Sequence, residues 1–128
     1  MKAILKIIAV LMLSTILSEA QHFRVGYVTY ISKKDLMSSG GKKLTSAAAI
    51  LQQDRANYHK FKKRDKGDTD DGGFFAELKN RSNFPTLLKR GKVHKSMLNL
   101  IRKGDVHILV ELFTDEQGNE YLDVSLVE

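Results

Sequence analysis

The sequence contains no cysteine, no tryptophan and a single proline among its 128 residues. Without cysteine the chain cannot form disulfide bonds, so the stability of its fold must come from packing. The same absence removes a thiol nucleophile from the chemistry that the protein can perform. The composition therefore excludes small disulfide-stapled domains and cysteine-dependent enzymes.

The sequence also lacks the short motifs that identify common enzyme classes. It has no GxSxG nucleophile motif and no glycine-rich phosphate-binding loop. HxxxH and HExxH spacings are absent among its four histidines, so the sequence gives no support for a zinc site. No motif specifies an enzyme, and we expect no cofactor.

Long apolar runs are absent too, and the most apolar segment lies at the N-terminus. A positively charged start precedes an apolar run over residues 7–13, and Ser18 and Ala20 supply the small residues that a signal peptidase recognises. The run is shorter than the roughly 20 apolar residues of a transmembrane helix. A cysteine for lipid attachment is missing. We therefore expect a signal peptide over 1–20, cleaved near Ala20, and one periplasmic or secreted domain over 21–128.

Charge is unevenly distributed along the chain, whose formal net charge is +6. Lysine and arginine dominate from His22 to Arg64, whereas the segment from Asp105 to Glu128 contains seven acidic residues and neither lysine nor arginine. These regions either neutralise each other in the folded protein or leave a basic face for an anionic partner. Export argues against nucleic acid and favours an anionic ligand, an envelope component or a protein partner.

The residue pattern predicts a small α+β fold. Valine, tyrosine, phenylalanine and threonine dominate His22–Ser32, which we expect to be a central or covered strand. Alternating apolar residues on both sides of the turn at 115–119 predict a β-hairpin. We expect three or four helices between them, at residues 44–61, 74–81, 83–90 and 93–103, with Gly91 and Gly104 ending the last two. The predicted architecture is a small antiparallel sheet packed on a helical layer, with the N-terminal strand pairing with the hairpin.

The most informative segment is LTSAAAILQQDRANYHKF, residues 44–61. At 100° per residue, its apolar side chains fall on the arc that an amphipathic helix turns toward a core, and this arc includes Tyr58 and Phe61. Asp54 lies in the middle of the same arc. A buried carboxylate must be hydrogen-bonded, paired or protonated, so Asp54 is either an anchor satisfied by Tyr58 or by a distant arginine such as Arg81, or part of a site.

The polar residues of this helix and of the basic run after it are the candidate site. Asp54 and His59 are the catalytic candidates, although about 140° around the helix axis separates them. The ligand-binding candidates are Arg55, Asn57, Tyr58, His59, Lys62, Lys63 and Arg64. A purely structural hydrogen-bond network would use the same residues.

A strongly charged stretch without apolar residues follows at 63–73, and we expect it to be a surface loop. Hard cations prefer several carboxylate oxygens from one flexible loop, but the calcium-loop spacing is not met, because Lys79 occupies the position of the bidentate glutamate. We therefore favour ion pairs between this loop and the neighbouring Lys62, Lys63 and Arg64 over a metal site. The metal-ligand candidates are Asp65, Asp68, Asp70 and Asp71.

The helix segment together with the aspartate-rich loop resembles small exported bacterial proteins of uncharacterised activity. The resemblance covers Leu44–Phe75 and implies no activity. The sequence as a whole predicts a non-enzymatic exported binding protein whose basic helical face contacts an anionic partner. The alternative is a small metal-dependent hydrolase or nuclease that uses Asp54, His59 and the acidic loop, by which we mean the charged stretch at residues 63–73.

Overall fold

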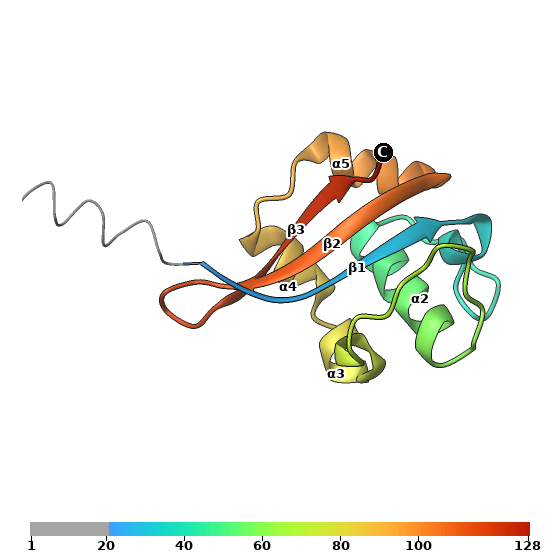
Figure 1. Ribbon diagram of the computed structural model, residues 1–128. Helices are drawn as coiled ribbons and strands as arrows, with labels where there is room; N and C mark the ends of the chain where they lie inside the picture. Colours follow the sequence, from blue (N-terminus) through green and yellow to red (C-terminus); the bar gives the residue numbers. More distant parts are fainter. Residues whose placement is uncertain (1–20) are drawn as a thin grey trace, which may run out of the picture.

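The structure is a computed structural model that describes residues 21–128, so the predicted signal peptide lies outside the described residues. The elements follow in the order β1 (His22–Ile31), η1 (Lys33–Leu36), α2 (Ala47–His59), η2 (Phe74–Ala76), α3 (Leu78–Arg81), α4 (Phe84–Arg90), α5 (Lys95–Lys103), β2 (Val106–Thr114) and β3 (Glu120–Leu126). The predicted α+β class is confirmed (Figure 1). In this part of the chain no helix is both long and apolar enough to cross a bilayer.

The three strands form one antiparallel sheet in the order β1-β2-β3. Tyr27 of β1 lies opposite Val110 of β2, which lies opposite Val124 of β3, so the N-terminal strand pairs with the hairpin as predicted. Of the two alternatives expected for β1, the central position is wrong, because β1 is an edge strand. Its free edge is instead covered by the loop described below, which bonds to the backbone of Val28 and Tyr30.

Helices cover one face of the sheet, with α2, α4 and α5 on the same side (Figure 1). Side chains from the sheet and from the helices meet in a single core. Its fully buried members include Ile31, Ile108, Leu112 and Leu122 from the strands and Ile50, Leu51, Phe84, Leu87 and Ile101 from the helices. Removing this apolar surface from water is the main source of stability in a chain without disulfides.

The helix α2 begins after Ser46, whose Oγ accepts a hydrogen bond from the N–H of Ala49 at 3.1 Å. It ends at His59, two residues before Phe61, so Phe61 is 38% exposed instead of facing the core. Leu78, in the helix predicted at 74–81, is 64% exposed. The short turn η2 interrupts the helix predicted there and changes the direction of the side chains that follow.

Two glycines end helices for different reasons. Gly104 ends α5 with φ of 77°, the left-handed conformation that favours glycine. Gly91 ends α4 with φ of −73°, so it does not adopt that conformation. A Cβ at Gly91 would instead lie 1.7 Å from the carbonyl oxygen of Leu122. Glycine is needed at this position because α4 and β3 approach each other closely.

Candidate functional site

Most of the polar candidates on α2 are inside the protein. Asp54, Arg55, Asn57 and Tyr58 are each at most 5% exposed. The helix contacts η1, η2, α3, α4 and α5, so little of its surface remains for solvent. These side chains therefore belong to an internal network and not to an open helical face.

Arg55 is the centre of this network. Its guanidinium carbon lies 3.8 Å from the centroid of the Tyr27 ring and 4.4 Å from that of the Tyr58 ring. Its Nε donates a hydrogen bond to Asp54 Oδ2 at 3.0 Å, and its Nη1 donates one to Asp71 Oδ2 at 3.1 Å. Aromatic faces and carboxylates are the partners that allow a guanidinium to be buried.

Asp54 is satisfied by groups that the sequence did not indicate. Its Oδ1 accepts a hydrogen bond from the Thr29 hydroxyl at 2.7 Å, and its Oδ2 accepts the bond from Arg55. The distant arginine suggested as its partner, Arg81, donates instead to the carbonyl oxygens of Phe75 and Ala76. The anchor for Asp54 is thus the edge strand β1 and the next residue of its own helix.

The charges in this network are unequal, because one guanidinium faces two carboxylates. Burial raises the pKa of Asp54 to about 7, while the positive charge of Arg55 opposes this shift. Burial tends to lower the pKa of Arg55, but the acidic groups of Tyr27, Asp54 and Asp71 raise it by more. Arg55 therefore stays charged, whereas Asp54 takes up a proton close to neutral pH.

Asp71 extends the network to His59. Its Oδ2 lies 2.7 Å from His59 Nε2, and its carboxyl group is fully buried. Asp54 and His59 are therefore joined through Arg55 and Asp71, although they point to different sides of α2. Helical periodicity alone could not reveal this link, because Asp71 comes from a separate loop.

His59, Asp70 and Asp71 are the one group in residues 21–128 whose ligand atoms lie close enough to hold a metal ion, all within 4.8 Å of one another. However, Asp71 Oδ2 already accepts a hydrogen bond from the positively charged Arg55. A divalent cation would have to share this oxygen with a guanidinium, at an electrostatic cost. The Asp71 carboxylate is thus already occupied by hydrogen bonds and is not free to bind a metal ion. The other two metal-ligand candidates, Asp65 and Asp68, do not belong to this group.

The acidic loop covers the free edge of β1, where unpaired backbone groups would otherwise be exposed. Thr69 exchanges two bonds with Val28, because its N–H donates to the Val28 carbonyl at 2.9 Å and its hydroxyl accepts from the Val28 N–H at 2.8 Å. Asp68 Oδ1 accepts from the Tyr30 N–H at 2.9 Å. Polar groups of the acidic loop thus bond to the edge of β1 at which a fourth strand would otherwise pair.

The expected ion pairs between this loop and the basic run after α2 are not formed. Asp65 pairs with Lys34 of η1, and Asp71 pairs with Arg55 and His59. Asp68 is bound to β1 and to the N–H of Asp65. Most residues of the loop are exposed, as expected for a surface loop, but Asp71 is buried and Asp65 and Asp68 are half-buried, because their carboxylates bind partners other than the basic run.

Asp35 belongs to the same region and was not predicted. It is 1% exposed and accepts hydrogen bonds from Asn57 Nδ2 at 2.8 Å and from the Ser32 N–H at 3.0 Å. Burial raises its pKa. The Ser32-x-x-Asp35 spacing is that of a capping box, which could have indicated its role at the start of η1. The contact with Asn57 has no such local signal.

The basic residues after α2 form a defined surface, which we call the basic turn, residues 60–64. Lys62 has a left-handed φ of 56° and turns the chain back, so that the Lys63 N–H donates to the Asn57 carbonyl at 2.8 Å. Arg64 lies 4.0 Å from the centroid of the Tyr58 ring and donates to the Tyr58 carbonyl. Exposed cations project from it at Lys60, Lys62, Lys63 and Arg64.

Comparison of the chain with protein-family models, with curated proteins and with solved structures gives no match.

Proposed function

We propose that the protein is a small exported, non-enzymatic binding protein that contacts an anionic partner through the basic turn. This proposal is supported by the contacts that the nearby acidic side chains make. In sequence, Asp65, Asp68, Asp70 and Asp71 follow the basic turn and would neutralise it. In the fold Asp70 stays exposed, but Asp65, Asp68 and Asp71 are held by Lys34, by β1 and by Arg55.

The cations of the basic turn are consequently left without carboxylate partners among the described residues. Four of its five residues are exposed lysine or arginine, and their combined field attracts anions over a distance of about 10 Å at moderate salt. Phe61 is exposed between them, with Lys60 Nζ 5.3 Å from its ring centroid. A phosphate-rich or carboxylate-rich envelope component, or an acidic protein, matches this chemistry.

The proposal also includes the localisation of the protein. We propose that the chain is cleaved near Ala20 and that the domain acts in the periplasm or outside the cell. Mass spectrometry of the exported protein should then give a mature chain that begins at Gln21. A mature product that still carries Met1 would contradict both the export and the choice of partner.

Binding to sulfated dextran tests the contact surface. The variant K60Q/K62Q/K63Q removes three cations from the basic turn, and the control R90Q/K95Q/K103Q removes three exposed cations from α4 and α5. We expect the turn variant to lower the salt-dependence slope of binding by about three and the control to change it much less. Equal losses in both variants would show that net charge alone drives binding, and would contradict the proposal.

One observation favours the alternative of a metal-dependent hydrolase, namely the closeness of His59, Asp70 and Asp71. Two others oppose it, because Asp54 is 2% exposed and Arg55 occupies the position beside Asp71. A resident metal would raise the melting temperature by mass action. We expect manganese and zinc at micromolar concentration to leave it unchanged, and a saturable rise would restore this alternative.

A further inference from the structure

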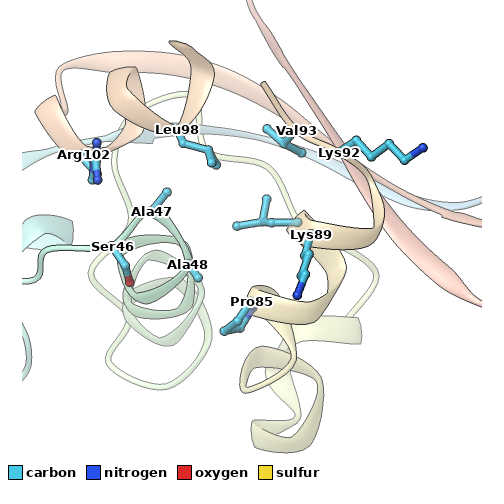
Figure 2. Close-up of a pocket in the computed structure, with 10 residues that line it drawn as sticks. Ser46, Ala47, Ala48, Pro85, Lys89, Lys92, Val93, Leu98 and Arg102 are labelled. Carbon is cyan, nitrogen blue, oxygen red and sulfur yellow. The ribbon is translucent and has the colours of Figure 1, made fainter. Parts of the chain in front are cut away.

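A groove of about 490 Å³ opens between α2, α4 and α5, at the end of α2 opposite to the basic turn. Figure 2 shows the first turn of α2 on one side, α4 on the other and α5 across the top. Most of the side chains that line it are apolar. The apolar lining consists of Ala47, Ala48, Pro85, Leu88, Val93 and Leu98.

The rim of the groove is positively charged. Lys89 of α4 and Arg102 of α5 flank the floor from two sides, and Lys92 stands at its outer end and points away (Figure 2). No acidic residue lines the groove. None of the three cations has a carboxylate within ion-pair distance in residues 21–128. The groove thus combines an apolar floor with positive charge that nothing in this part of the protein neutralises.

The start of α2 adds to this positive potential. Ser46 caps the helix and lines the groove, and the N–H groups of Ala47 and Ala48 have no carbonyl partner within the helix. The first turn of α2 contains no acidic residue, so its partial positive charge is not compensated locally. A carboxylate near Arg102, which lies beside the first turn of α2 in Figure 2, would therefore also face the helix N-terminus.

We infer that this groove binds a single acyl chain that ends in a carboxylate, a ligand of the fatty-acid class. The apolar floor takes the chain, Arg102 and the start of α2 take the charged head, and Lys89 adds positive charge from the opposite side of the groove. The volume lies in the lower half of the roughly 300–1,000 Å³ typical of ligand pockets, which suits one chain better than a two-chain lipid. This site lies beyond the proposed function, because it shares no residue with the basic turn.

Displacement of a fluorescent fatty acid, dansylaminoundecanoic acid, tests the inference. Below their micellar concentrations, dodecanoate should displace the probe, whereas dodecanol, which lacks the charge, and hexanoate, which lacks the chain, should compete at least about tenfold less well. Dodecanol that competes as well as dodecanoate would overturn the assignment of the cationic rim. The absence of saturable probe binding would overturn the site itself.

Paired variants locate the head group. K89Q/R102Q should weaken probe binding by about tenfold or more, whereas R90Q/K103Q, which changes the next residue on each of the same helices, should leave it within about twofold. Equal losses in the two pairs would show nonspecific attraction and overturn the inference. A48L should fill the floor and abolish binding, with thermal unfolding as the check of its fold.

The same assay separates this site from the proposed function. K60Q/K62Q/K63Q should bind the probe as tightly as the unmodified protein while it loses affinity for sulfated dextran. K89Q/R102Q should bind sulfated dextran as tightly as the unmodified protein while it loses affinity for the probe. Loss of probe binding in the basic-turn variant would overturn the inference, whatever the result with sulfated dextran.

Discussion

At the scale of single residues, the protein is organised around a charge that water cannot reach. Arg55 is 0% exposed and lies against two tyrosine rings, with hydrogen bonds to two carboxylates. Burying an ion pair brings little net stability, but removing one partner leaves the other charge uncompensated. The residues around Arg55 are consequently interdependent.

We predict that Arg55→Leu destabilises the protein by about 3–5 kcal/mol, because Asp54 and Asp71 lose their shared cation. Arg64 offers a matched control, since it also lies against Tyr58 but is exposed. Arg64→Leu should cost less than about 1 kcal/mol. Urea denaturation of both variants gives the comparison, and similar losses would show that the buried charge has no special role.

The raised pKa of Asp54 predicts a pH dependence. The folded protein holds the Asp54 proton up to about pH 7, whereas the unfolded chain releases it near pH 4. The stabilisation linked to this proton is therefore fully present below about pH 4 and is lost as the pH rises to about 7. Asp35, whose pKa is also raised, acts in the same direction.

Asp54→Asn should remove its part of this dependence, so its free energy of unfolding should fall less between pH 4.5 and 7 than that of the unmodified protein. Asp54→Ala should cost about 1–3 kcal/mol, because Thr29 and Arg55 lose their acceptor. Denaturation curves at several pH values measure both effects. A pH profile that the Asn variant leaves unchanged contradicts the assigned titration.

At the scale of elements, the acidic loop acts as a cover for an edge strand. Thr69 and Asp68 satisfy backbone groups of β1 that no strand reaches, and Asp71 closes over α2. Sequence patterns assign this stretch to the surface because it has no apolar residue. What they miss is that short polar side chains can pair with a strand about forty residues earlier.

We predict that Asp68→Ala loosens this cover. The amide of Tyr30 should exchange hydrogen faster, and the protein should lose about 1–3 kcal/mol, because a backbone donor loses its acceptor. Asp70→Ala is the control, since Asp70 is exposed and accepts only from the next N–H. Hydrogen exchange of both variants, followed by NMR, decides whether Asp68 holds the loop.

At the scale of the whole molecule, local signals predict the fold well. The hairpin and the end of α5 at Gly104 follow from patterns within a few residues, and the pairing of β1 with the hairpin follows from the small number of strands. The candidate site could not be predicted from local patterns, because its contacts join β1, α2 and the acidic loop across large sequence distances. Asp54 was recognised as unusual, but Thr29 and Asp71, which explain it, carry no signal of their own.

The folded chain separates two positively charged surfaces by the length of α2. The groove lies at the start of this helix and the basic turn at its end. Three of the four aspartates that follow the basic turn, Asp65, Asp68 and Asp71, are engaged by Lys34, by β1 and by Arg55. Because of this division of charge, binding of polyanions should be a local property of residues 60–64 and should not follow from the net charge.

Chemical-shift mapping with inorganic tripolyphosphate tests this claim most directly. Backbone amides of a labelled sample would be followed during titration at low salt. We predict that the largest shifts occur at residues 60–64 and that they exceed those at the exposed Lys95 and Lys103. Shifts spread evenly over all exposed lysines, or centred away from the basic turn, would contradict it.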